Sequence, residues 1–183
     1  MSLEPLSVWK STLAALPPTN TGAWSANFAS WYATRTLPIS PDPSVFLASG
    51  FLFTFNSAIF QTQLSALMPV NNAVAGITGF ANAWEAAILA STVLVAPGSA
   101  LVPPSPPTIF SVVATSIIDA PSIALGKLKL LELVSAPQVP DANDSQFPEK
   151  FRDATMLLTF TVTGINSIAP VPTPLVAPLI PLL

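Results

Sequence analysis

Proline positions limit where helices can run in this sequence. Of the 183 residues, 21 are proline, a residue that lacks the backbone donor and disrupts a helix interior. Pro17-Pro18, Pro69 and Pro97-Gly98 each follow an amphipathic segment, so each predicts the end of a helix. The stretch from Ala96 to Pro107 holds five prolines and predicts a linker. Helices of ordinary length are therefore expected before this linker.

Apolar residues in that part recur every three or four positions, which is typical of amphipathic helices. The spacing predicts helices over residues 3–16, over the segment that starts at Thr21, and over residues 60–68. A fourth helix, capped by Asn71 or Asn72, is expected to end at Pro97-Gly98. Its apolar stripe is formed by Ile77, Phe80, Trp84, Ile88 and Val95.

The sequence after the linker favours strands. Residues 109–119 are rich in β-branched side chains, which fits a strand or a short helix. In residues 123–134, Lys127 and Lys129 alternate with leucines, a strand pattern. Leu125, Leu128 and Leu131 have helical spacing, but Gly126 and the flanking prolines favour the strand.

The last third adds a polar loop over residues 136–150 and a strand over residues 153–166, where threonines alternate with apolar residues. We therefore predict an α+β fold: a helix-rich N-terminal part, a small antiparallel β part and an extended proline-rich C-terminal arm. One domain is expected over residues 1–168, divided into helix-rich 1–96, linker 97–108 and β-rich 109–168. The arm is residues 169–183.

This arm is too apolar to remain solvated and too rich in proline to fold alone. It contains five prolines and no charge, so an extended, polyproline-like path is expected. Its large aliphatic side chains are stabilised by burial, each by roughly 1.5–3 kcal/mol. We expect the arm to lie in a groove of a neighbouring subunit, with a groove of its own domain as the alternative. The side chains expected to make this contact are Leu175, Val176, Leu179, Ile180, Leu182 and Leu183.

Charge is scarce along the whole chain. Only 8% of residues are charged and the formal net charge is −3, whereas globular domains have roughly 25% charged residues. Six basic residues without a cluster argue against a nucleic-acid partner. No stretch forms a clean apolar span of about 20 residues, so a membrane-embedded protein is the less favoured alternative. Scarce charge instead predicts a surface covered by other protein chains.

Residue types that dominate catalysis and metal binding are missing. The sequence has no His and no Cys, which excludes Ser-His-Asp and Cys-His triads and thiolate metal sites. Asp141, Asn143 and Asp144 resemble the opening of a calcium loop, but the turn glycine is absent, so a solvated loop is expected. No pair of carboxylates is placed for acid–base work. We therefore predict no enzymatic activity, no cofactor, no small-molecule substrate and no metal.

Aromatic residues concentrate near the N-terminus. Trp24, Trp31 and Tyr32 lie in the second predicted helix, close to the tryptophan of the first. They are interpreted as core residues, or alternatively as contacts to a neighbouring subunit, because tryptophan and tyrosine often anchor interfaces.

The overall composition resembles that of structural proteins of tailed-bacteriophage virions. Few charges, many Ser, Thr and Pro, no Cys or His and an extended arm together carry this resemblance, which involves no family motif. It implies a passive role in a virion, assembled with copies of itself and with other virion proteins. A tail, neck or baseplate component is the favoured interpretation. A capsid decoration protein and a membrane-associated protein are the alternatives.

Overall fold

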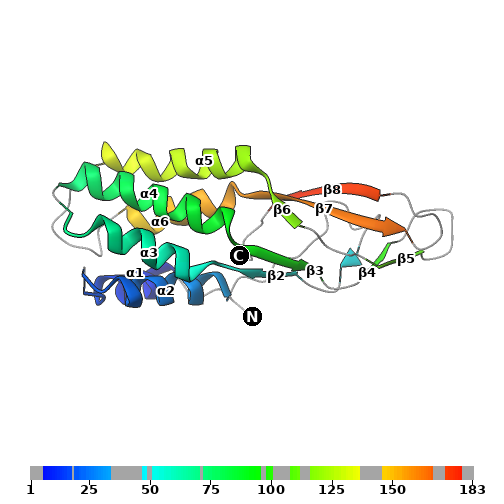
Figure 1. Ribbon diagram of the computed structural model, residues 1–183, viewed down its shortest axis with the longest axis horizontal. Helices are drawn as coiled ribbons and strands as arrows, with labels where there is room; N and C mark the ends of the chain where they lie inside the picture. The colour runs from blue at the N-terminus through cyan, green and yellow to red at the C-terminus, as the bar shows by residue number, and fades with distance from the viewer. Residues whose placement is uncertain are drawn as a thin grey trace.

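The computed structural model describes residues 6–17, 19–33, 47–48, 51–70, 72–95, 98–100, 108–111, 116–136, 146–166 and 172–178. Within these residues the chain is helix-rich, as predicted. The helices gather at one end of an elongated molecule, and the strands extend from the other (Figure 1). The helices are α1 (Leu6–Ala14), α2 (Thr21–Ala33), α3 (Ser57–Leu67), α4 (Ala73–Leu89), α5 (Ala120–Leu131) and α6 (Phe147–Met156), and a 3-10 turn, η1 (Glu132–Val134), follows α5.

The described strands pair antiparallel. β2 and β3, which α3 and α4 separate in the sequence, form a two-stranded sheet, and β7 is paired with β5, β6 and β8. The strands are β1 (Leu47–Ala48), β2 (Phe51–Thr54), β3 (Thr92–Val95), β4 (Gly98–Ala100), β5 (Thr108–Ser111), β6 (Ser116–Ile118), β7 (Thr159–Asn166) and β8 (Pro172–Pro178).

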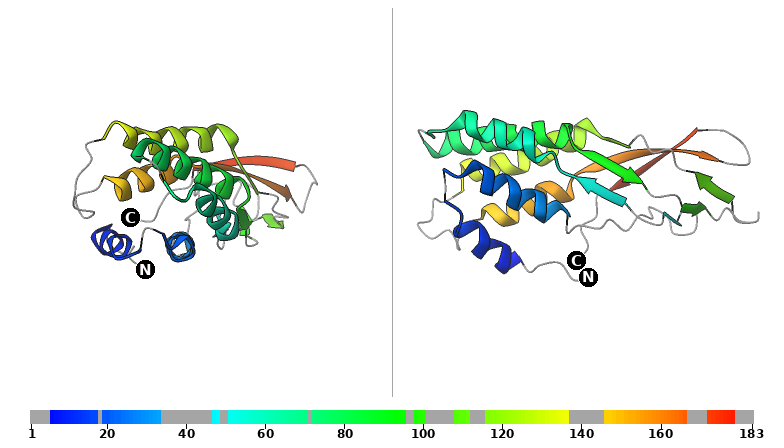
Figure 2. Two further views of the ribbon diagram at one scale, coloured as in Figure 1. Left: turned by 60° about the vertical axis from the view of Figure 1, so that its left-hand side comes forward. Right: turned by 60° about the horizontal axis from the view of Figure 1, so that its bottom comes forward.

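The helices pack around an aromatic core with Phe151 of α6 at its centre. The Phe151 ring lies 5.4 Å from Trp9 of α1, 4.6 Å from Phe28 and 5.1 Å from Trp31 of α2, measured between ring centroids. α6 thus lies between α5 and the α1–α2 pair (Figure 2). Aromatic pairs at these separations contribute beyond the area they bury, so α6 is a central element of the bundle.

Several predicted helices are confirmed. Trp9 and Leu13 of α1 are buried, and Leu16 packs against the same core. α4 begins at a cap, because the Asn72 side chain accepts a hydrogen bond from the Ala75 backbone N–H at 2.8 Å. α2 begins at Thr21 as expected, but its cap is Asn20, whose side chain accepts from the Ala23 N–H.

Four predictions are wrong, the last of them only in its first residues, since β7 confirms the rest of that strand. α4 ends at Leu89, and Val95 belongs to β3 instead of the helical stripe. Residues 123–134 are helical, in α5 and η1, because Gly126 lets the helix pack closely on α4. The loop predicted over 136–150 and the start of the strand predicted over 153–166 overlap α6, since Pro148 occupies its first turn, where proline is tolerated. Residues 109–168 therefore contain two helices as well as strands.

Two expectations fall largely outside the described residues. The acidic segment with Asp141, Asn143 and Asp144 is one, and most of the proline-rich linker is the other. Within the predicted C-terminal arm, only β8 is described, and its backbone pairs with β7 from Thr159↔Pro178 to Ile165↔Pro172.

Candidate interaction site

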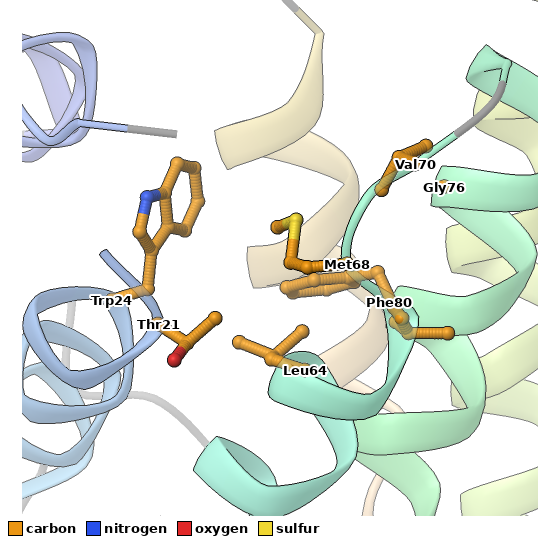
Figure 3. A pocket seen from close by; sticks show the side chains of 8 residues that line it. Thr21, Trp24, Leu64, Met68, Val70, Gly76 and Phe80 are labelled. Atoms are coloured by element: carbon orange, nitrogen blue, oxygen red, sulfur yellow. The ribbon is translucent and has the colours of Figure 1, made fainter. Parts of the chain in front are cut away.

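An apolar pocket opens between the start of α2, the end of α3 and the first turns of α4. Its volume is about 140 Å³. Trp24 and Thr21 stand on one side, facing Met68, Leu64 and Phe80 on the other (Figure 3). We call this the α2–α4 pocket, and its lining residues are Thr21, Trp24, Leu64, Leu67, Met68, Val70, Gly76 and Phe80.

Hydrogen bonds fix the wall that α2 supplies. The Thr21 hydroxyl lies 2.8 Å from the Ser65 hydroxyl, which joins the start of α2 to α3. The Trp24 indole N–H donates to the Pro17 carbonyl at 3.1 Å. Because the polar edge of the indole is satisfied outside the pocket, its apolar ring is available to line the cavity.

Two glycines of α4, of which Gly76 lines the pocket, shape the opposite wall by letting neighbours approach closely. A Cβ at Gly79 would come within 2.3 Å of Leu67 Cδ2, and a Cβ at Gly76 within 2.9 Å of Val70 Cγ1. Both separations are shorter than a non-bonded carbon contact of roughly 3.5–4.0 Å. The glycines therefore determine how the α3–α4 turn lies against α4.

The rim of the pocket is apolar and exposed. Met68 and Val70, which line the pocket, have exposed fractions of 38% and 43%. They occur within three residues at the α3–α4 turn. Exposed apolar groups that continue outward from a pocket are typical of protein interaction sites, because a small ligand enclosed in the cavity would leave them in water.

The segments that build this pocket carry no charge. α2, α3 and residues 68–84 contain no Asp, Glu, Lys or Arg. The described charges lie outside these segments, and all except Asp119 belong to the ion pairs Lys10–Glu149, Lys127–Glu85, Lys129–Glu132, Lys150–Glu132 and Arg152–Asp153. The pocket is thus suited to an uncharged, apolar partner.

A second apolar surface lies on α5. Leu125 and Leu128 are 54% and 60% exposed and, being three residues apart, share one face of the helix. We call this pair the leucine ridge. On the adjoining helix α4, Leu89 is 61% exposed. It lies one turn beyond Glu85, which receives a 2.6 Å hydrogen bond from Lys127 of α5.

The ion pairs next to the leucine ridge perturb two titratable groups. Hydrogen bonds from Lys150 and from Lys129 to the Glu132 carboxylate lower its pKa. The same carboxylate raises the pKa of Lys150. Both side chains are on the surface, so these groups fix charge positions between α5 and α6 without forming a shielded reaction centre. Among the described residues, no three His, Cys, Asp or Glu side chains are grouped so that they could hold a metal ion.

The predicted site residues fall into three groups. Trp31 and Tyr32 are 3% and 2% exposed, so in this chain they pack in the core instead of presenting a surface. Trp24 is partly buried and lines the α2–α4 pocket. Leu175 and Val176 lie in β8, where their backbones pair with Val162 and Thr161. Leu179, Ile180, Leu182 and Leu183 lie outside the described residues.

Sequence reasoning missed the α3–α4 turn and the outward face of α5. The signal for the turn was the uncharged segment from Met68 to Val74, with apolar residues on both sides of two asparagines. The signal for the ridge was a second helical stripe, offset from its leucines, formed by Ile123, Gly126 and Leu130 of α5 and Leu133 of η1.

Comparisons with protein-family models, with characterised proteins and with solved structures give no match to this chain. Within the described residues, none of the helices has both the length and the apolar character needed to cross a membrane.

Proposed function

We propose that this chain is a non-enzymatic assembly protein of a virus particle, of the kind found in a phage tail, neck or baseplate. In this role it packs against copies of itself and other virion proteins through apolar helix surfaces and through its C-terminal arm. The proposal includes two further features of the fold: a small antiparallel β part and an extended C-terminal arm.

One observation carries the assembly role: the leucine ridge is solvent-exposed in a chain with very little charge. Covering a leucine that is otherwise exposed contributes roughly 1.5–3 kcal/mol. Most surfaces keep a molecule apart from its copies by charge, but only 8% of this sequence is charged. Two neighbouring leucines on such a surface favour association with another chain.

The assignment to a virus particle is supported by composition, and it predicts closed or repeating assemblies. Rings and helical tubes are built from repeated contacts between identical copies. A capsid decoration protein would use the same apolar surfaces on a preformed shell and would stay small in isolation. Electron microscopy of the purified chain distinguishes these roles, because a neck or tail component forms rings or tubes by itself.

The test of assembly is the mass in solution. Multi-angle light scattering of the full chain is expected to give multiples of 19.1 kDa that persist in high salt, since apolar contacts are not screened. Replacing the ridge by Leu125→Gln and Leu128→Gln is expected to reduce this mass. The matched control is Ala58→Gln with Thr62→Gln on the exposed face of α3, which should leave the mass unchanged.

A single 19.1 kDa species at every concentration, without detergent, would overturn the assembly role. A chain that stays in solution only with detergent would support the membrane-associated alternative instead.

A further inference from the structure

We propose that the α2–α4 pocket receives residues 179–183 of a second copy of this chain, so that the copies join head to tail. This inference rests on the assembly role proposed above and names the site and the segment through which one contact is made. The segment is LIPLL, which follows β8 in the sequence and lies outside the described residues.

The size and chemistry of the pocket select an aliphatic side chain. Apolar cavities of about 150 Å³ stay dry and accept a benzene-sized group, and this one measures about 140 Å³. Its walls are Trp, Leu, Met, Val and Phe side chains, with the Thr21 hydroxyl at one edge. Met68 adds an adaptable surface, because methionine fills irregular gaps. One leucine or isoleucine fits such a cavity.

The exposed rim requires an occupant larger than one side chain. Met68 and Val70 extend the apolar surface beyond the cavity, so a segment with several aliphatic residues would cover them. Residues 179–183 supply three leucines, one isoleucine and one proline. The proline also reduces the entropy lost on binding, because it restricts the free segment.

Charge agrees with this choice. The pocket segments α2, α3 and residues 68–84 have no Asp, Glu, Lys or Arg side chain, and residues 154–183 have none either. A charged segment entering the pocket would lose hydration without gaining an ionic partner. The neutral, aliphatic tail carries no such penalty.

The geometry favours a second copy over the chain's own tail. β8 ends at Pro178, opposite Thr159, which follows the C-terminal end of α6. The pocket lies at the other end of α6, since Trp24 contacts Phe147 there with ring centroids 6.4 Å apart. The ten residues of α6 span about 15 Å. Five extended residues reach at most about 17 Å, so of residues 179–183 in the same copy only Leu183 could reach the pocket, and the exposed rim would stay uncovered.

A contact between different surfaces of identical copies is heterologous and repeats from copy to copy. The leucine ridge is separate from it and can make its own contact. The two surfaces therefore predict different consequences for mutation, and they can be tested independently.

The experiment uses disulfide trapping in the full-length chain, which has no natural cysteine. One chain carries Met68→Cys in the exposed lining of the pocket and the other carries Leu182→Cys in the tail. Mixed under mild oxidation, they are expected to form a disulfide-linked dimer. Because docking raises the effective concentration of the two thiols, the rate should be at least about ten-fold above that of the control. The matched control is Ala58→Cys, exposed on α3 away from the pocket.

Two further variants make the result specific. Val70→Asp, at an exposed rim position, is expected to abolish trapping by Met68→Cys. A single chain carrying both Met68→Cys and Leu182→Cys should crosslink between copies, and a disulfide within one copy would overturn the trans arrangement.

If Met68→Cys traps the tail no faster than Ala58→Cys, the pocket is not the receiving site. The assembly role fails separately, when the unmodified chain remains at 19.1 kDa. An assembly that is dispersed by the leucine-ridge variants, but not by Val70→Asp or by removal of residues 179–183, overturns the head-to-tail inference and leaves the assembly role standing.

Discussion

The Trp84 indole N–H donates a hydrogen bond to the Tyr32 hydroxyl at 2.9 Å, which joins α4 to α2 inside the core. The Tyr32 oxygen lies 3.0 Å from the Thr155 hydroxyl of α6, and Thr155 itself donates to the Phe151 carbonyl. Since Thr155 has one hydroxyl proton, Tyr32 is the donor to Thr155. Three helices are thus linked by one directed chain of hydrogen bonds.

Removing the tyrosine hydroxyl should therefore destabilise the fold. Tyr32→Phe leaves the Trp84 N–H buried without its acceptor and deprives Thr155 of a donor. An unsatisfied buried polar group costs roughly 1–3 kcal/mol, and we expect a loss in that range from urea unfolding. The control is Thr62→Val on the exposed face of α3, where the hydroxyl only bonds the Ala58 carbonyl of its own helix. Equal stability of the two variants would contradict the buried chain of hydrogen bonds.

Gly126→Ala tests the close packing of α5 on α4 and α6. A Cβ at this position would lie 2.5 Å from Trp84 Cη2 and 2.8 Å from the Ala154 carbonyl oxygen. Overpacking of this kind costs typically about 1–3 kcal/mol, which exceeds the gain of about 1 kcal/mol in helix propensity. A lower midpoint of thermal unfolding is expected.

The matched control for Gly126→Ala is Gly22→Ala in α2. There the nearest atom to a new Cβ is Nε2 of Gln61, 3.3 Å away at the end of an exposed side chain that can move. This variant should be neutral or slightly stabilising. If both glycine variants are more stable than the unmodified chain, helix propensity alone determines the change in stability and the packing argument is wrong.

The same glycine explains why α5 was predicted as a strand. In the sequence, Gly126 and the flanking prolines lower helix propensity, and the lysines alternate with leucines. In the fold, the inward stripe is Ile123, Gly126 and Leu130. The glycine is part of the packing surface, because only it fits under Trp84. A local pattern could not reveal this, since Trp84 lies on another helix.

The pattern for α6 was present but obscured. Phe147, Phe151, Ala154 and Leu158 follow one another at steps of four, three and four residues, and the last three are buried. Polar residues before Phe147 and the proline at position 148 suggested a loop. Proline is compatible with the first turn of a helix, where its missing N–H has no partner to lose.

The candidate site could be predicted only in part. Trp24 was identified from its position on a helix, and it does line the pocket. The other walls come from α3, the α3–α4 turn and α4. These walls come together because Gly76 and Gly79 of α4 allow close contact with Val70 and Leu67. Spacing along the chain contains no information on that contact.

The two asparagine caps should differ in their contribution to stability. Asn72→Ala removes one exposed hydrogen bond, to the Ala75 N–H, and a loss of about 1 kcal/mol is typical of a cap. Asn56 accepts from the Ile59 N–H at 3.1 Å and also donates its amide to the Ala90 carbonyl, which ties α3 to the end of α4. Asn56→Ala should therefore cost more, about 2 kcal/mol. Urea midpoints give the comparison, and equal losses would show that the link to Ala90 contributes nothing.

The lowered pKa of Glu132 predicts the sign of a pH effect. Hydrogen bonds from Lys150 and then Lys129 hold this pKa below its usual range. A carboxyl group with a lower pKa in the folded state stabilises the fold above its ordinary pKa, and this contribution is lost as the pH falls through its folded-state pKa. Glu132→Gln should thus lower the melting temperature slightly near neutral pH. The difference should shrink in acid and in high salt, because surface charges are screened. A difference that is constant with pH would contradict the ion pair.

Carboxyl chemical shifts followed by NMR measure the Glu132 pKa directly and separate its causes. Lys150→Met removes the largest of them, so the Glu132 pKa should rise toward its usual range. Lys10→Met is the matched control, because Lys10 pairs with Glu149 and not with Glu132. The raised pKa of Lys150 stabilises the folded state at neutral pH. This contribution to stability is lost only in alkaline solution, as the pH rises through the folded-state pKa of Lys150. If Lys10→Met shifts the Glu132 pKa as much as Lys150→Met does, the pKa is set by general surface charge. The ion pair between Glu132 of η1 and Lys150 of α6 would then not be its cause.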